Sequence, residues 1–333
     1  MSSGLIDIHT HVTPPTLPHG PPGVPGWPCM HCEGGRTTML LGDKPFRELD
    51  SRSWDVARRT EDMDADGVDI QLLSPMPELL SYWFSVGDAE HVADHVNAHI
   101  AEMVARNPRR FRGFGMAPLQ DPGRAATYLE SLRSRFGLIG IEIGSNIGGI
   151  LPGDTQFHPF FAAAEAHDLG VFIHALHPIA TRSVTLGPEF APVVGFPLDV
   201  GMAGASLLIT GLLERHPRLR IALSHGGGAM VSLLGRLDQG WSNLPGLRAT
   251  LQERPSVAAK RLFYDSNVYD PRFLRYLATD IAPERVCVGT DYPYLIMQRD
   301  PKGYIASSDL SANILRNVTR DAAFKYLGES EID

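Results

Sequence analysis

The amino-acid sequence predicts a (β/α)₈ barrel. The chain has 333 residues, a common length for a single α/β barrel. Eight short apolar, strand-like segments alternate with segments of helical periodicity, which implies a parallel sheet with right-handed crossovers. The first of these segments is not followed by the Gly-x-Gly-x-x-Gly pattern of a doubly wound open sheet. We therefore expect one barrel domain over residues 1–333.

The expected strands are short, apolar and rich in β-branched residues. The first, Leu5–Val12, reads as a fully buried strand, and the second ends at Pro75. In chain order, the eight strands are expected at residues 5–12, 68–74, 111–117, 138–143, 171–174, 220–225, 261–266 and 285–290.

Helices are expected between these strands, with recognisable ends. The long helix that starts at Asp88 stops before Pro108, and the next helix has Gly137 in the position of a carboxyl-terminal cap. A longer connection follows the fifth strand. The expected helices cover residues 54–65, 88–107, 121–136, 157–169, 206–215, 229–239, 271–279 and 308–327.

Residues 13–50 look different from the rest of the chain. Prolines interleaved with glycines make regular helix unlikely there, although Thr37 to Leu41 could form a short strand. We expect a lid or a small irregular insertion subdomain. The segment Cys29-Met30-His31-Cys32 could be a zinc knuckle, but no second ligand pair follows, so ordinary loop residues are favoured.

Composition excludes several classes of function. The formal net charge is −8 and no basic stripe is present, which argues against binding to nucleic acid. Three cysteines fit a reducing compartment and not a disulfide framework. No apolar run approaches the roughly 20 residues of a membrane helix, and no signal peptide is recognisable. We expect a cytoplasmic protein that does not enter membranes.

Polar residues gather where barrel active sites lie, at the carboxyl ends of the strands. Residues two apart on a strand share a face, so His9 and His11 can reach one metal ion, with Asp7 below them on the same face. A single histidine at a strand end usually packs in the core. Four histidines and an aspartate at converging strand ends are hard to explain by packing. The ligand set suits zinc with an open position for water. The polar strand-end residues are His9, His11, Ser74, Glu142, His174, His225, Asp265 and Asp291.

These residues also carry a family resemblance. The sequence resembles the amidohydrolase superfamily, and within it the branch typified by 2-amino-3-carboxymuconate-6-semialdehyde decarboxylase. The resemblance covers nearly the whole chain. The matching motifs are Asp7-Ile8-His9-Thr10-His11, Phe46-Arg47, Ser81-Tyr82-Trp83, Pro108-Arg109-Arg110-Phe111, Ile173-His174, Ser224-His225-Gly226-Gly227-Gly228, Gly235-Arg236 and Gly289-Thr290-Asp291-Tyr292-Pro293.

The resemblance implies roles for individual residues. Asp291 would be both a metal ligand and a catalytic residue, and His225 would act as acid and base on a metal-bound water. Arg47 would grip a substrate carboxylate, and Arg236 would do so from the neighbouring subunit of a homodimer. The implied zinc ligands, with manganese as another possible metal, are His9, His11, His174 and Asp291. The other expected substrate contacts are Trp83, Tyr294 and His177.

The chain departs from the family pattern around the substrate. Leu41 stands nearest to the position of a family lysine, although Lys44 is close, and Tyr294 stands where the family often has phenylalanine. Residues 177–196 differ clearly, with an additional His177 and Arg182. These differences leave the substrate open but do not affect the expected metal site.

A metal-activated water beside a histidine could serve two reactions. Arginines that fix a carboxylate favour decarboxylation of a ring-cleavage acid such as 2-amino-3-carboxymuconate-6-semialdehyde, although surface ion pairing is the alternative role for both arginines. A hydrolase or hydratase of a related acid or lactone, and a decarboxylase of an aromatic hydroxy acid, remain alternatives. So does a non-catalytic protein with a structural metal, although such sites are usually closed by four protein ligands.

Overall fold

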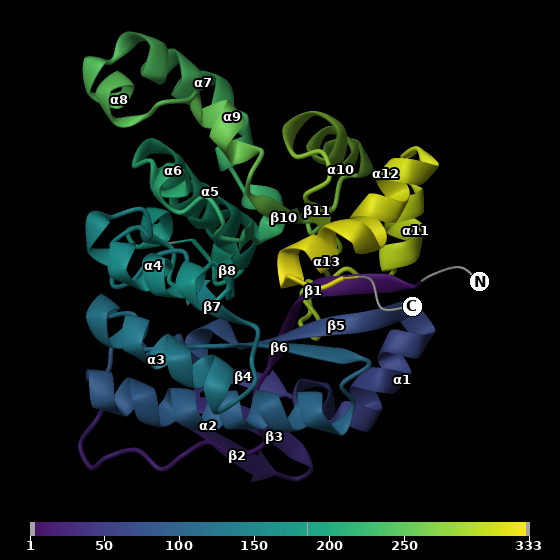
Figure 1. Cartoon of the computed structure of the whole chain (residues 1–333). Helices are drawn as coiled ribbons and strands as arrows, with labels where there is room; N and C mark the ends of the chain where they lie inside the picture. Colours follow the sequence, from purple (N-terminus) through teal and green to yellow (C-terminus); the bar gives the residue numbers. More distant parts are fainter. Residues whose placement is uncertain (1–3, 185, 331–333) are drawn as a thin grey trace.

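A computed structural model describes residues 4–184 and 186–330. Eight parallel strands follow one another in chain order around a barrel (Figure 1). The last strand returns to the first, because the backbone N–H of Ile8 donates to Val288 O at 2.9 Å and that of His11 donates to Tyr292 O at 2.8 Å. The predicted (β/α)₈ barrel is confirmed. Its strands are β1 Leu5–Val12, β5 Val68–Pro75, β6 Phe111–Gly115, β7 Gly140–Gly144, β8 Gly170–His174, β9 Ile221–Leu223, β10 Phe263–Asp265 and β11 Val286–Cys287.

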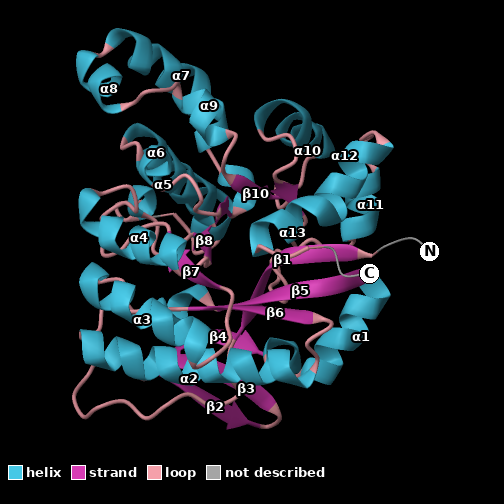
Figure 2. Cartoon of the chain, in the orientation of Figure 1, coloured by secondary structure: helices cyan, strands magenta, loops and turns pink. Residues whose placement is uncertain are grey.

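Helices surround the barrel (Figure 2). Aspartates begin several of them: Asp55 accepts a hydrogen bond from the backbone N–H of Arg58, and Asp121 accepts one from Arg124. The helices are α1 Val56–Asp66, α2 Val86–Arg106, α3 Pro122–Ser134, α4 His158–Ala166, α5 Phe196–Ile209, α6 Leu212–Arg215, α7 Met230–Asn243, α8 Pro245–Thr250, α9 Pro255–Ala259, α10 Pro271–Tyr276, α11 Pro301–Ala306, α12 Ala312–Arg316 and α13 Ala322–Leu327.

The connection from β8 to β9 is more helical than expected. A π-helical turn, Ala191–Gly195, runs directly into α5, which begins well before the expected start at Ser206. Together they form a 19-residue helix that is long and apolar enough to cross a membrane, so the expectation that no run approaches this length is wrong. Half of it is buried inside the protein. Its Asp199 is buried and accepts a hydrogen bond from Asn146 Nδ2 at 2.9 Å, which fits a helix packed on the barrel.

The insertion after β1 is more regular than its composition suggested. It contains a three-stranded antiparallel sheet, of which only residues 37–41 were expected as a strand. Gly34 and Gly35 join the first two strands with φ of +58° and +80°, as a two-residue hairpin turn requires. Cys29 and Cys32 are exposed on the first strand, and the described residues show no metal-ligand group there. The strands are β2 Pro28–Glu33, β3 Arg36–Leu41 and β4 Lys44–Leu49.

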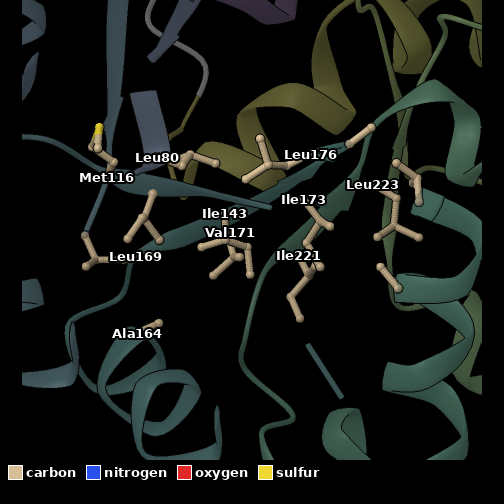
Figure 3. Close-up of a cluster of buried hydrophobic side chains, with 14 of the residues drawn as sticks. Leu80, Met116, Ile143, Ala164, Leu169, Val171, Ile173, Leu176, Ile221 and Leu223 are labelled. Carbon is tan, nitrogen blue, oxygen red and sulfur yellow. The ribbon is translucent and has the colours of Figure 1, made fainter. Parts of the chain in front are cut away.

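The core has two layers because side chains alternate along each strand. Val171 and Ile173 of β8 pack outward beneath the helices (Figure 3). Phe172 between them belongs to the cluster inside the barrel, which also contains residues of α13. The ring of Tyr326 on α13 lies 5.6 Å from that of Phe114. One end of the barrel is thus filled with apolar side chains, and the carboxyl ends of the strands are left for polar groups.

Candidate metal centre and substrate cavity

Two histidines at the end of β1 form one side of the site. The pairing of β1 with β5 shifts register between Asp7 and Thr10, which interrupts the alternation of side chains. His9 Nε2 and His11 Nε2 lie 3.2 Å apart, and both residues are buried. Asp7 does not join them as expected, since its carboxylate accepts hydrogen bonds from the hydroxyl of Thr290 at 2.6 Å and from the Thr290 backbone N–H.

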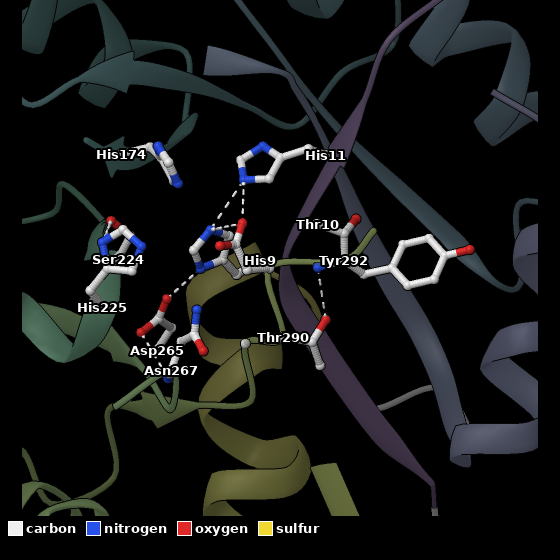
Figure 4. Close-up of polar contacts among 12 residues, drawn as sticks. His9, Thr10, His11, His174, Ser224, His225, Asp265, Asn267, Thr290 and Tyr292 are labelled. Carbon is white, nitrogen blue, oxygen red and sulfur yellow. Dashed lines mark hydrogen bonds and ion pairs between the residues drawn. The ribbon is translucent and has the colours of Figure 1, made fainter. Parts of the chain in front are cut away.

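His174 and Asp291 complete the group (Figure 4 shows His174 facing the β1 histidines). His174 ends β8, and Asp291 follows β11 with its backbone N–H donating to His9 O at 2.9 Å. Asp291 Oδ1 lies 3.2 Å from His11 Nε2 and 3.5 Å from His9 Nε2. One ligand atom from each of the four residues lies within 4.8 Å of the others, so one ion could contact all four. We call His9, His11, His174 and Asp291 the ligand group.

The Nδ1 atom of each histidine has an acceptor of its own, which turns Nε2 toward the centre of the group. The pairs are His9 with Asp265 Oδ2 at 2.5 Å, His11 with Pro75 O at 3.1 Å and His174 with Ala175 O at 2.9 Å. Asp265 is itself fixed, because its Oδ1 accepts hydrogen bonds from the backbone N–H groups of Gly226 at 2.7 Å and Asn267 at 3.1 Å. The orientation of the ligand group is therefore built into the fold.

The ligand group fits a divalent metal ion. His174 Nε2 is buried and has no hydrogen-bond partner among the described residues, although buried nitrogens are normally paired. Burial lowers the pKa of His11 and that of His174, which keeps both rings neutral, as metal ligands must be. Burial would raise the pKa of Asp291, but the hydrogen bond to His11 and the nearby charge of His9 lower it, so this carboxylate is ionised.

His9 differs from the other two histidines. Burial lowers the pKa of His9, but the hydrogen bond to Asp265 and the charges of Asp291 and Asp265 outweigh it and raise the pKa. Asp265 remains ionised, because the hydrogen bond and charge of His9 lower its pKa against the opposing effect of burial.

The ligand group as a whole offers three imidazole nitrogens and one carboxylate. This donor set suits zinc and related transition ions.

His225 stands beside the ligand group without belonging to it. The centre of its ring lies 5.5 Å from that of His9 and 5.3 Å from that of His174. Burial and the nearby charge of His9 lower the pKa of His225 to about 4, so the ring is neutral at pH 7. A neutral imidazole at this position can accept a proton and pass it on.

The glycines after His225 are required by local packing. A Cβ on Gly228 would overlap Pro197 O, and a Cβ on Gly227 would lie 2.7 Å from the ring of Tyr264. Both glycines also have positive φ, which side chains rarely tolerate. The space that side chains would need at these two positions is filled by Pro197 of α5 and Tyr264 of β10.

A cavity of about 620 Å³ opens beside the ligand group. Three of the expected substrate contacts line it together with two ligand residues. These five are Arg47, Tyr294, His177, His174 and Asp291. The guanidinium carbon of Arg47 lies 4.2 Å from the centre of the Tyr294 ring, which stacks on His11 at 5.0 Å. The β4 strand of the insertion thus places a cation directly over the wall of the cavity.

Two other expected substrate contacts lie outside this cavity. Trp83 stacks on His177 at 4.7 Å between ring centres and is 41% exposed, so it supports a wall residue from behind. Arg236 is exposed on α7 and does not line the cavity of its own chain.

Two residues of the site, Glu78 and Asn267, were not predicted, and Glu142 was named as a strand-end residue without a role. Glu78 lines the cavity and pairs with His177 Nε2 at 3.0 Å. Glu142 is buried with no hydrogen-bond partner among the described residues, and burial raises its pKa well above the usual range. Asn267 lies two residues beyond Asp265. Strand-end position was the available signal for Glu142 and Asn267, whereas nothing in the loop sequence distinguished Glu78.

The chain belongs to the amidohydrolase family, whose model matches residues 6–328. The predicted membership is therefore confirmed. Among similar proteins, 2-amino-3-carboxymuconate-6-semialdehyde decarboxylase of Dictyostelium discoideum is 33% identical over 331 residues, which cover 97% of this chain and 91% of that protein. Gamma-resorcylate decarboxylase of a Polaromonas species is 26% identical over 279 residues, which cover 77% of this chain and 82% of that protein.

Solved structures give the same result. That of 5-carboxyvanillate decarboxylase from Sphingomonas paucimobilis is 25% identical with a TM-score of 0.82, over 99% of this chain and 100% of the other. A 5-carboxyvanillate decarboxylase from Novosphingobium aromaticivorans, complexed with manganese, is 25% identical with a TM-score of 0.73, over 84% and 82% of the two chains. The resemblance to a decarboxylase branch is confirmed, and the chain is an enzyme of this superfamily.

Proposed function

We propose that the protein is a metal-dependent, non-oxidative decarboxylase of a small carboxylic acid. The observation that carries the proposal is the ligand group, whose unpaired nitrogen and ionised carboxylate face a cavity that also presents Arg47. Beside it stands His225, a half-buried neutral imidazole. Metal ligands, a carboxylate binder and a proton carrier are the parts that this reaction needs.

Each residue has a defined part in the proposed reaction. Arg47, whose guanidinium carbon lies 4.2 Å from the centre of the Tyr294 ring, would bind a substrate carboxylate through paired N–H groups. His225 would take up a proton and deliver it to the carbon that bears the departing carboxylate. The bond from that carbon to the carboxyl carbon then breaks, carbon dioxide leaves, and the bonding electron pair restores the conjugation of the substrate. The net change is one proton gained and one carbon dioxide lost.

We expect zinc in the ligand group, with manganese as the second candidate because a related structure contains it. A divalent ion held there would supply a Lewis acid that polarises substrate oxygens. The chain's own contribution is orientation: Asp265 fixes His9, and two backbone carbonyls fix His11 and His174. This arrangement leaves room for substrate beside the ion.

For the substrate, we propose a carboxylated ring-cleavage product such as 2-amino-3-carboxymuconate-6-semialdehyde, as in the Dictyostelium relative. An aromatic hydroxy acid is the second candidate, because gamma-resorcylate and 5-carboxyvanillate decarboxylases are also similar. Hydrolysis or hydration of a related acid or lactone would use the same groups but release no carbon dioxide.

We also propose a homodimer in which Arg236 serves the partner's site. Arg236 is exposed on α7, and α7 to α9 extend away from the barrel (Figure 1). A two-fold axis would give each site one arginine from the other chain. Mixed dimers of an Arg236→Ala chain and a His225→Ala chain should regain one working site, whereas each homodimer should be nearly inactive. No recovery in verified mixed dimers would contradict this role of Arg236.

We also propose a cytoplasmic location and a lid role for residues 13–50.

The proposed function is tested by carbon dioxide release. Metal-loaded protein should release carbon dioxide from at least one carboxylated semialdehyde or hydroxybenzoate. His225→Gln should lower the rate by about 10²- to 10⁴-fold while retaining most of the metal. The matched control is His216→Gln, at the end of α6, where the ring pairs with Glu165 and not with the ligand group. Turnover of the same compounds without carbon dioxide would favour the hydrolase or hydratase, and an empty metal site in His225→Gln would make His225 a ligand.

A further inference from the structure

The substrate site has a second lobe that also borders Asp291. A smaller cavity of about 320 Å³ is lined by His225 and Asn267, and the 620 Å³ cavity is lined by Arg47. We call them the asparagine lobe and the arginine lobe. Four residues line both lobes, which makes them two parts of one site. These are Pro192, Phe196, Asp291 and Ile296.

Asn267 is a buried polar group without a partner. It is 3% exposed, and neither its amide oxygen nor its amide nitrogen has a hydrogen-bond partner among the described residues. The Tyr269 hydroxyl donates to Ile296 O at 2.6 Å. Its contact with the Asn267 amide lowers the pKa of Tyr269 less than burial raises it, and neither amide atom reaches hydrogen-bond geometry with a described partner. A buried amide left unpaired costs stability, so this side chain requires an explanation.

The backbone holds Asn267 rigidly in place. Its N–H donates to Asp265 Oδ1 at 3.1 Å, and the other oxygen of Asp265 orients the metal-ligand candidate His9 (Figure 4). The backbone of Asn267 is thus fixed relative to the ligand group by one shared carboxylate. An unpaired side-chain amide carried by a fixed backbone, at the wall of a lobe, is the arrangement expected of a substrate contact.

The lining of the asparagine lobe indicates what it can bind. No lysine or arginine is among its described lining residues, and His225 is neutral. A second carboxylate would therefore be disfavoured there, whereas it would be favoured beside Arg47 in the other lobe. A carboxamide both donates and accepts hydrogen bonds, so it matches an uncharged polar group.

We infer that Asn267 is a specificity-determining residue that binds an uncharged polar substituent of the substrate, a hydroxyl, amino or carbonyl group. This inference rests on the proposed function and narrows its substrate class. The substrate carries a carboxylate on the side of Arg47 and a neutral hydrogen-bonding group on the side of His225. The amino or aldehyde group of a ring-cleavage acid and the hydroxyl of an aromatic acid both meet this requirement.

The test is a binding experiment that does not depend on turnover. Dissociation constants for benzoate and for the three isomers each of hydroxybenzoate and aminobenzoate are measured by calorimetry on zinc-loaded protein. Asn267→Leu keeps the side-chain size and removes the amide. At least one substituted benzoate should bind the wild type more tightly than benzoate, and Asn267→Leu should reduce that preference about tenfold, as loss of one buried hydrogen bond implies.

Controls separate this inference from its alternatives. Benzoate itself and the bound zinc should change little in Asn267→Leu, and Asn243→Leu, on the exposed face of α7, should change neither preference nor affinity. An unchanged preference for every substituted benzoate would overturn the inference and leave Asn267 as a water-binding or structural residue. If the binding preference depends on Asn267 but no carbon dioxide is released from any acid, the proposed reaction fails while the substrate contact stands.

Discussion

The two ends of the barrel use the same strands for opposite purposes. At one end, Phe114 and Phe172 fill the interior together with Tyr326 from α13. At the other end, His174 Nε2 and the Asn267 amide are buried without partners among the described residues. Along β8 the change takes only two residues, from Phe172 to His174. The residues that stabilise the fold and those that form the site therefore lie at different ends of one barrel. It should be possible to perturb each end alone.

The largest effect should come from the ligand group. His174→Ala removes one nitrogen donor and should abolish metal binding and carbon dioxide release together. The unfolding free energy of the metal-free protein should fall by only about 1 kcal/mol, because the ring loses one hydrogen bond, from Nδ1 to Ala175 O, and Nε2 has no partner to lose. Metal analysis, activity and denaturant unfolding measure the three quantities. His19→Ala, in the exposed insertion, is the control, and a fully active metal-free His174→Ala protein would refute the site.

The opposite end should show the opposite pattern. Phe114→Ala leaves a void between Tyr326 and the two glycines on which the ring packs, Gly140 and Gly170. We expect a loss of about 3–5 kcal/mol in unfolding free energy. Protein that stays folded should keep its metal content and its rate per bound metal. The control is Tyr276→Ala, because Tyr276 is 46% exposed. A selective loss of metal in Phe114→Ala would show that the two ends of the barrel are coupled.

Asp265, at the end of β10, orients one residue of the ligand group and should have an intermediate effect. Asp265→Asn can keep one acceptor but exchanges the other for a donor, so it cannot satisfy His9 and two backbone N–H groups as before. Metal affinity should fall by about 10- to 100-fold. Competition with a chelator measures it. Asp270→Asn, at the exposed start of α10, should leave the affinity unchanged, and an unchanged affinity in Asp265→Asn would show that His9 needs no orienting carboxylate.

The smallest effect concerns a histidine outside both ends. Burial lowers the pKa of His99 on α2 to about 4, below the value near 6.5 of an unfolded chain. Between these values the unfolded state binds more protons, so stability falls as the pH drops from about 6.5 to 4. His99→Leu should remove about 1–2 kcal/mol of this loss, allowing for partial exposure. Unfolding curves of metal-free wild-type and His99→Leu protein at pH 7 and 4.5 measure this loss of stability. An equal loss in the two proteins would show that another group causes the pH sensitivity.

The sequence alone predicted the barrel because its strands carry local signals. Apolar runs ending in histidine or aspartate located both the sheet and the residues that converge on the ligand group. The register shift in β1 could not be predicted in this way, since it depends on the pairing with β5, and Asp7 was misplaced as a result. The early start of α5 was also missed, because Pro192 and Pro197 look like breaks but lie at first-turn positions of helical segments.

Substrate contacts were harder to predict than metal ligands. Arg47 and Tyr294 were identified through family motifs, and the cavity brings them together. Asn267 carries no distinctive motif; its position near a strand end was a weak signal, and its burial without a partner among the described residues is visible only in the structure. Such a property depends on the surrounding structure and cannot be deduced from the order of residues.

The central claim, that the ligand group supports decarboxylation, is tested most directly by titrating metal back into metal-free protein. Carbon dioxide release should rise in proportion to bound zinc or manganese and level off at about one ion per chain, as one four-residue site implies. His174→Ala should show neither binding nor release over the same range. Carbon dioxide release by metal-free protein, or a fully loaded site with no release from any carboxylated semialdehyde or hydroxybenzoate, would contradict the account.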